Sequence, residues 1–142
     1  MEYQVDIEIQ KPANECFKAY TEANSIMKWM PNLLSIKNTK GKLFAESSEG
    51  YFVFDQHGHE MIMEIEVVEV KSPYEITMLY RVPGAKNTCI NHFKEDNLHT
   101  HWIMNVIFEF EEDPNLDIEI FKKSTLMSME IFKKHMEESY HD

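Results

Sequence analysis

The chain has 142 residues, and its 14 basic and 25 acidic side chains give a net charge of −11 with neutral histidines. Nucleic acids and anionic membranes present phosphates that repel such a charge, so binding to either through bulk charge is excluded. Hydrophobic residues at 43% and charged residues at 27% are ordinary for a globular protein, which argues against wholesale disorder.

The cysteines and the start of the chain indicate a compartment. Cys16 and Cys89 match no metal or redox spacing, and two reduced, packed thiols favour a cytoplasmic protein. The first residues contain neither a basic region nor an apolar core, so no signal peptide is visible. No apolar run approaches the roughly 20 residues that span a bilayer. We therefore expect a cytoplasmic protein without integral membrane association.

The chain begins with a predicted strand and two helices. Residues 3–10 alternate strictly between apolar and polar, which is typical of a strand with one face in the core. Pro12 suits the first turn of a helix, and apolar residues recur at helical spacing from residue 13 to about 23. A second short helix is predicted over residues 26–29, before Pro31.

A run of strands and a final helix follow. The adjacent Val67 and Val68 break the alternation of one strand, which suggests a bulge or a local twist. Asp113, Pro114 and Asn115 have the residue types that cap a helix, here one from about residue 116 to 140. The predicted strands include residues 33–36, 43–46, 51–55, 61–70, 75–82 and 88–94, and a last strand that reaches Phe110.

These elements predict an α+β protein with one antiparallel meander. A single sheet must bury its apolar face against another element, and the long C-terminal helix is the only one large enough. We therefore expect residues 1–142 to form a single domain with a helix-grip fold. It would have a curved seven-stranded antiparallel sheet wrapped around that helix, and two short helices after the first strand. A sheet that curls around a helix packs imperfectly and tends to leave a cavity.

Motifs spread over the whole chain resemble those of the START-like superfamily (SRPBCC, helix-grip). The first strand with residues 11–20 looks like that superfamily's strand, proline and first helix. Residues 28–31, Lys-Trp-Met-Pro, resemble its tryptophan-containing exit from the second helix, and residues 68–73 resemble its mid-sheet turn. The resemblance implies a hydrophobic ligand cavity, but no particular reaction, because such a fold hosts binders and enzymes alike.

One departure concerns the branch within that superfamily. Chaperone activators often carry a glycine-tryptophan pair in the last helix, and residues 124–129 read Ser-Thr-Leu-Met-Ser-Met instead. This difference lowers the chaperone-activator interpretation relative to polyketide cyclase-like or generic binding branches.

The predicted ligand-binding cavity lies between the inner sheet face and the last helix. The chain has ten methionines, whose flexible, polarizable side chains fill irregular space. Methionines in strands share faces with aromatic residues, and the small Ser124, Thr125 and Ser128 leave room at mid-helix. The residues expected to line the cavity are Met61, Met63, Met78, Tyr80, Trp102, Met104, Phe108, Phe121, Thr125 and Phe132.

Polar and charged candidates have simpler explanations. Tyr80 lies on the predicted inner face, where its hydroxyl is a polar handle for a ligand. Arg81 lies on the opposite face and is expected to pair with a surface glutamate rather than to hold a ligand carboxylate. The His57–His59 and His99–His101 pairs belong to turns expected at opposite ends of the sheet, which argues against a four-histidine metal site. A two-histidine site at one turn lacks a third ligand in the sequence, and we assign no metal, cofactor or catalytic residue.

The favoured function is binding or transport of a small hydrophobic or amphipathic ligand, lipid-like or polyketide-like. One alternative is a cyclase- or dehydratase-like enzyme in the same cavity, with Tyr80 or a histidine as acid or base. It requires two ionisable groups that converge in the cavity, such as His92 or His101 beside Tyr80. The other is a protein-interaction domain, in which Ile62, Ile103 and Ile107 on the outer sheet face mediate pairing, including a possible homodimer.

Overall fold

Seven strands and three helices make up the described part of the chain. The structure is a computed structural model, and it describes residues 1–138. The strands are β1 (Glu2–Ile9), β2 (Leu33–Lys40), β3 (Glu49–Gln56), β4 (His59–Lys71), β5 (Glu75–Val82), β6 (Ala85–Asp96) and β7 (His99–Phe110). The helices are α1 (Ala13–Thr21), α2 (Ala23–Trp29) and α3 (Ile118–Glu138).

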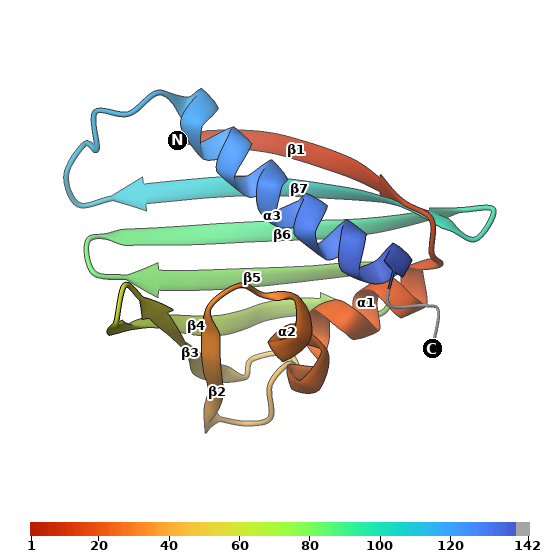
Figure 1. The fold of residues 1–142 in the computed structure, drawn as a ribbon, viewed down its shortest axis with the longest axis horizontal. Helices are drawn as coiled ribbons and strands as arrows, with labels where there is room; N and C mark the ends of the chain where they lie inside the picture. The colour runs from red at the N-terminus through yellow and green to blue at the C-terminus, as the bar shows by residue number, and fades with distance from the viewer. Residues whose placement is uncertain (139–142) are drawn as a thin grey trace.

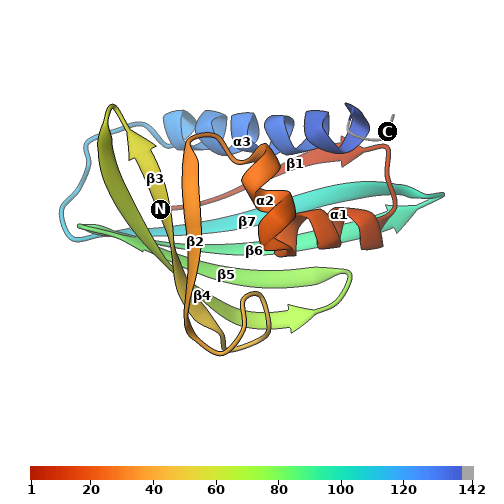
Figure 2. The same cartoon turned by 60° about the horizontal axis from the view of Figure 1, so that its bottom comes forward.

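The strands form one antiparallel sheet in the order β1-β7-β6-β5-β4-β3-β2. The sheet curls, and α3 lies across its inner face over β7 and β6 while α1 and α2 cover the same face beside it (Figure 1). In the turned view, β2 and β3 rise towards the level of the helices (Figure 2). The predicted fold class, a curved seven-stranded antiparallel sheet with a long C-terminal helix, is confirmed.

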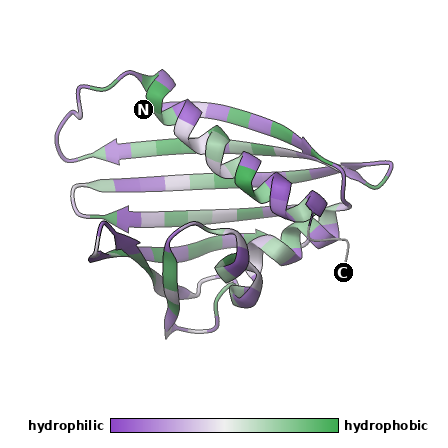
Figure 3. Ribbon diagram, in the orientation of Figure 1, coloured by the Kyte–Doolittle hydropathy of each residue, from purple (hydrophilic) through white to green (hydrophobic). Residues whose placement is uncertain are grey.

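Alternation along each strand decides which residues reach the helix. In β1, Tyr3, Val5 and Ile9 are buried, whereas the intervening polar residues face solvent. Strands such as β1 therefore show alternating apolar and polar bands (Figure 3). Residues that pair directly across neighbouring strands point to the same side of the sheet. Tyr3 pairs with Val106 and Val106 pairs with Cys89, so all three face inward. The inner face is thus mainly apolar, with Asn87 and Asn91 of β6 among its polar residues.

The predicted irregularity in β4 is confirmed. The register of β4 against β5 shifts between Val67 and Glu69, so Val68 is an extra residue with its side chain 44% exposed. Val67, by contrast, is fully buried. The bulge lets Val67 and Val70 both face inward although they are three positions apart.

The short strand predicted over residues 43–46 is wrong. This segment makes turns, in which the Ala45 N–H donates to the Lys42 carbonyl and the Leu43 N–H donates to the Asn38 side chain. Leu43 and Phe44 still pack against the core from these turns. The prediction failed because apolar residues that pack inward from a turn resemble a short strand in the sequence.

The boundaries of the last helix also differ from the prediction. Asp117 caps the N-terminus of α3, because its Oδ1 accepts a hydrogen bond of 2.9 Å from the Glu119 N–H. The predicted cap, residues 113–115, lies before the helix. Asp113 instead accepts from the N–H of Asn115 within that segment. The predicted helix end at Tyr140 lies outside the described residues.

Candidate functional site

A cavity of about 260 Å³ lies between the inner sheet face and α3. Its walls come from α1, α2, the four strands β4 to β7 and α3. The lining residues are Tyr20, Trp29, Met30, Met63, Tyr80, Asn87, Cys89, Trp102, Met104, Phe108, Ser124, Thr125, Ser128 and Met129. None of these side chains is formally charged at neutral pH, so the cavity, as lined by the described residues, is a largely apolar space with a few hydroxyl, thiol and amide groups.

Five rings form the aromatic cluster that closes one end of the cavity: Tyr20, Trp29, Phe93, Trp102 and Phe132. The rings of Trp29 and Phe132 have centroids 4.9 Å apart, and those of Trp102 and Phe132 are 5.0 Å apart. Both contacts have the edge-to-face geometry that aromatic quadrupoles favour. Phe93 and Phe132 are fully buried behind this wall, whereas Tyr20, Trp29 and Trp102 also line the cavity.

A buried amide fixes the orientation of Trp102 in the aromatic cluster. The indole N–H of Trp102 donates to the Asn91 Oδ1 over 3.0 Å, and both residues are almost fully buried. The Asn91 amide in turn donates to the carbonyls of Ile76 and Cys89. Every polar atom of this group therefore has a partner, as a buried position requires.

The α3 wall of the cavity is made of small residues and is tied to the sheet. The Thr125 Oγ1 lies 2.7 Å from the Tyr3 hydroxyl, a hydrogen bond that joins α3 to β1. Ser124 and Ser128 lie on the exposed edge of this wall, while Met129 is buried at its inner end. The helix therefore offers space in its middle and firm packing in its C-terminal half, at Phe132 and Met136.

The groups inside the cavity wall are held in their neutral forms. Burial raises the pKa of the Cys89 thiol to about 12, against a smaller lowering by its hydrogen bond to Asn87. Burial likewise raises the pKa of Tyr20 and that of Tyr80 above the ordinary phenol value. The thiol and both phenols therefore stay protonated at neutral pH and present no charge to a ligand.

Six of the ten residues predicted to line the cavity do so in the structure. They are Met63, Tyr80, Trp102, Met104, Phe108 and Thr125. Whether they contact a ligand stays a prediction. The small Ser124 and Ser128 also lie in the wall, where the sequence suggested that they leave room.

The other four residues do not line the cavity: Met61 and Met78 lie elsewhere on the inner sheet face, and Phe121 and Phe132 lie elsewhere on α3. Met78 and Phe132 are fully buried in the core, because neighbouring side chains close over them. Phe121 packs against the rings of Phe108 and Phe110, with centroids 5.3 and 5.6 Å away. Met61 pairs across strands with Phe54, nearer the β3–β4 turn. The predicted sheet face was right for Met61 and Met78, but Met61 lies too near the β3–β4 turn and Met78 is covered by its neighbours.

Sequence reasoning missed six lining residues. Tyr20, Trp29 and Met30 come from the short helices and their exit, and the direction these elements face depends on how they dock. Met129, on α3, was not predicted to lie in the wall. Asn87 and Cys89 share the inner face of β6 with the buried Phe93, so strand parity alone was a usable signal.

The remaining sequence candidates lie outside the cavity. Arg81 pairs with Glu66 over 3.5 Å on the outer face, as predicted. His92 contacts Glu75 and His101 contacts Asp6, also away from the cavity. The acid–base role considered for the two histidines therefore lacks the necessary placement. Among residues 1–138, no group of three or more histidine, cysteine or acidic side chains is arranged to hold a metal.

The apolar residues proposed for pairing do not form one patch. Ile62 is 51% exposed on β4, but Ile103 and Ile107 are on β7 and half-buried. Two strands, β5 and β6, separate them. In the cross-strand register Ile107 is level with Glu66 of β4 and Ile103 is level with Lys71, so both are also displaced along the strand from Ile62. These three isoleucines could form one interaction surface only together with residues that lie between them.

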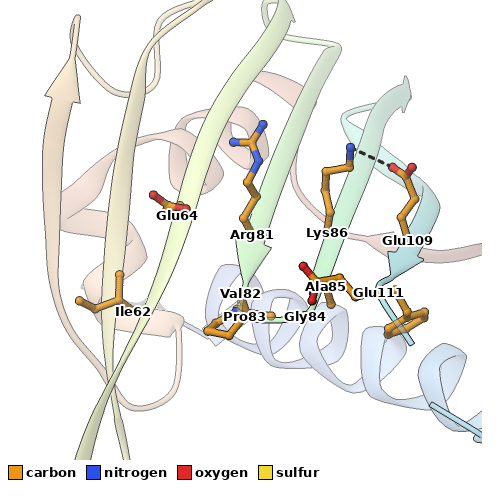
Figure 4. A pocket seen from close by; sticks show the side chains of 11 residues that line it. Ile62, Glu64, Arg81, Val82, Pro83, Gly84, Ala85, Lys86, Glu109 and Glu111 are labelled. Atoms are coloured by element: carbon orange, nitrogen blue, oxygen red, sulfur yellow. Dashed lines mark ion pairs between the residues drawn. The ribbon is translucent and has the colours of Figure 1, made fainter. Parts of the chain in front are cut away.

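A second hollow, of about 680 Å³, lies on the outer side of the sheet near the β5–β6 turn. Arg81, Lys86 and Glu109 stand on neighbouring strands along it, and Lys86 forms an ion pair with Glu109 (Figure 4). Glu64 and Glu111 add further acidic side chains. This hollow is an open, charged groove, which makes it a poorer site for an apolar molecule than the cavity beneath α3.

A curved sheet gripping a long helix over an apolar cavity is the architecture of the START-like superfamily. The family model for activator of Hsp90 ATPase homolog 1-like protein matches residues 10–137, and the chain belongs to that family. No curated protein matches the chain at a significant level. Within the described part of the chain, no helix has both the length and the hydropathy of a membrane span.

Solved structures share the fold at low sequence identity. Ara h 8.0201 superposes with a TM-score of 0.79 at 14% identity, covering 94% of this chain and 93% of that one. The protein NE0264 from Nitrosomonas europaea has a TM-score of 0.77 at 14% identity, over 99% and 97% of the two chains. DynU16, from the dynemicin biosynthetic locus, has a TM-score of 0.76 at 13% identity over 97% of this chain and 48% of its own. These likenesses show the shared fold, a curved antiparallel sheet with a long C-terminal helix.

Proposed function

We propose that the protein binds, and carries or senses, a small hydrophobic or amphipathic molecule in the cavity beneath α3. The observation that carries the proposal is the cavity itself, a space of about 260 Å³ whose described wall has aromatic, methionine and small polar side chains and no charged group. Apolar surface removed from water contributes about 25 cal/mol per Å², so such a wall favours an apolar occupant. The proposal treats residues 1–142 as one ligand-binding domain in the cytoplasm.

The size and lining of the cavity restrict the ligand. Ligand pockets usually measure about 300–1,000 Å³, so this cavity suits a molecule at the small end, such as a short lipid-like chain or a one- or two-ring compound. Methionines from three elements, Met63, Met104 and Met129, line it. Their flexible side chains can adapt to apolar molecules of different shape.

A cavity-filling variant with a matched control tests this function. Ser124→Phe places a ring at the exposed edge of the cavity wall, whereas Lys123→Phe puts the same ring on the neighbouring exposed position outside the wall. Butylbenzene at ten times its Kd should stabilise the unaltered protein by about 1.4 kcal/mol, seen as a rise in the unfolding temperature. We expect Lys123→Phe to retain this rise and Ser124→Phe to lose it.

Two results would count against ligand binding in this cavity. One is the absence of stabilisation by any alkylbenzene up to saturation in the unaltered protein. The other is stabilisation that survives unchanged in Ser124→Phe. Native mass spectrometry of the purified protein, followed by solvent extraction, then identifies whatever molecule it carries from the cell.

A protein-interaction domain of the chaperone-activator type is the second candidate. The family match favours it, and so do apolar side chains on the solvent side of α3, where Ile120 is 53% exposed and Met127 is 63% exposed. The rate of ATP hydrolysis by Hsp90 with and without the protein tests it. Unchanged hydrolysis at saturating protein would remove this candidate while leaving the ligand-binding proposal intact.

A further inference from the structure

Two tyrosine hydroxyls meet inside the cavity. Tyr20 comes from α1 and Tyr80 from β5, and both line the same space. Their oxygens are 3.5 Å apart, whereas hydroxyl–hydroxyl hydrogen bonds usually measure about 2.7–2.8 Å. The pair is therefore only loosely hydrogen-bonded, although Tyr20 is almost fully buried.

The Tyr20–Tyr80 pair has one phenol proton that the hydrogen bond between the two hydroxyls does not use. Each phenol carries one proton, and at most one of the two can lie between the oxygens. Against the larger effect of burial, a hydrogen bond from the Asn91 side chain acts to lower the pKa of Tyr20, which is the effect of a donor, so Asn91 does not take up a phenol proton. The remaining phenol proton is directed neither between the two oxygens nor at a charged acceptor, since no carboxylate lines the described cavity wall.

Asn87 adds an amide beside the tyrosines. It pairs with Tyr80 across β5 and β6, so both side chains are on the inner face, and it also lines the cavity. Its Oδ1 accepts a hydrogen bond from the Cys89 thiol over 3.4 Å. The amide nitrogen of Asn87 is thereby left as a second donor at the wall.

We propose that Tyr20, Tyr80 and Asn87 form a recognition site for the carbonyl oxygen of an uncharged, mainly apolar ligand, such as a ketone or an ester. This inference rests on the proposed ligand-binding function. A carbonyl oxygen accepts hydrogen bonds without offering a proton, which matches a site with surplus donors. A carboxylate fits poorly because the described wall has no cationic partner, and Arg81 lies on the opposite face.

The protonation of the pair is compatible with this role. Burial is the largest cause that raises the pKa of both tyrosines. Tyr20 raises the pKa of Tyr80 further, whereas the hydrogen bond with Tyr80 only partly offsets the effect of burial on the pKa of Tyr20. Both therefore remain hydrogen-bond donors throughout the pH range in which cytoplasmic proteins act.

A ketone and a hydrocarbon with the same carbon skeleton test the site. Butyrophenone and butylbenzene differ only in the carbonyl group, and calorimetry gives the Kd of each. One net hydrogen bond corresponds to roughly a threefold to tenfold change in affinity. We expect Tyr80→Phe to weaken butyrophenone by that factor and to leave butylbenzene unchanged or slightly tighter. The carbonyl stretching frequency of bound butyrophenone should rise in the variant, because a donated hydrogen bond lowers it.

Control variants keep the outcome interpretable. Tyr74→Phe makes the same change at a 54% exposed position between β4 and β5 and should alter neither affinity. Tyr20→Phe is a second test if Tyr80→Phe does not fold. An unchanged ketone-to-hydrocarbon ratio, or an unchanged carbonyl frequency, in a folded variant would overturn the carbonyl site while butylbenzene binding still supported the cavity. Failure of both ligands to bind the unaltered protein would instead overturn the ligand-binding function and this inference with it.

Discussion

Replacing Asn91 with leucine should destabilise the protein by about 1–3 kcal/mol, although leucine is apolar and similar in size. Asn91 is fully buried and accepts a 3.0 Å hydrogen bond from the Trp102 indole. Leucine cannot accept that bond, so a donor that is 2% exposed would be left without a partner. Leaving one buried group unsatisfied costs about 1–3 kcal/mol.

Smaller effects act in opposite directions around this estimate. The hydrogen bonds from Asn91 to the Ile76 and Cys89 carbonyls are long, at 3.2 and 3.4 Å, so their loss adds about 0.5 kcal/mol each. Burying a leucine side chain instead of an amide offsets about 1–2 kcal/mol. The unpaired indole therefore remains the deciding contribution.

Urea unfolding followed by circular dichroism measures the change in the free energy of unfolding, with an unchanged m-value as the condition for comparison. Asn105→Leu is the matched control, because Asn105 is on the outer face and its side chain accepts an exposed hydrogen bond from Gln4. We expect this control to lie within about 0.5 kcal/mol of the unaltered protein. The unfolding temperature of Asn91→Leu should fall by roughly 3–5 °C per kcal/mol.

A double-mutant cycle with Trp102→Phe isolates the hydrogen bond. Phenylalanine removes the indole donor, so the double variant Asn91→Leu/Trp102→Phe contains no unpaired group of this pair. It should be more stable than the two single effects predict, by about 1 kcal/mol or more. Strict additivity, or an Asn91→Leu variant as stable as the unaltered protein, would refute the assignment of this bond as a major support of the aromatic cluster.

Three further predictions concern other parts of the chain. Gly50→Ala should destabilise the protein by about 1–3 kcal/mol in urea unfolding, because the added Cβ would overlap the Lys37 carbonyl oxygen of β2; wild-type stability would contradict that close approach. The Cys89 thiol, whose pKa burial raises to about 12, should resist a disulfide reagent at pH 8 until the protein unfolds, and rapid labelling of the folded protein would show that the cavity wall is open there. Burial alone would raise the pKa of Glu137, but the hydrogen bond from Lys133 helps to lower it below the ordinary value, so its stabilisation is present above pH 4.5 and lost as the pH falls through the folded pKa. Glu137→Gln should therefore make stability less dependent on pH between about 5 and 3, and an equal slope in both proteins would exclude this role.

Strand parity made much of the fold predictable. Once Met63, Tyr80 and Met104 were assigned to one face, the position of the helix on that face followed from the need to bury it. The bulge near Val68 was visible because two adjacent valines cannot both face inward in a regular strand. Such inferences need only the period of the side chains and the burial of apolar surface.

The sequence predicted which sheet face lines the cavity better than it predicted which residues of that face reach it. Met78 and Met104 lie on the same sheet face, yet only Met104 lines the cavity. The difference depends on how far α1, α2 and the aromatic cluster fill the space, and docking angles of short helices leave no periodic signal. Tyr20 was missed for that reason, although its partner Tyr80 was predicted from strand parity.

Both tryptophans of the chain, Trp29 and Trp102, lie in the wall of the cavity. Each indole N–H is satisfied inside the protein, by the Ala19 carbonyl and by Asn91. The tryptophan fluorescence of the protein therefore arises beside the cavity, and an occupant that excludes water or contacts the rings changes its intensity and wavelength. Ligands can thus be screened against the purified protein without attaching a label.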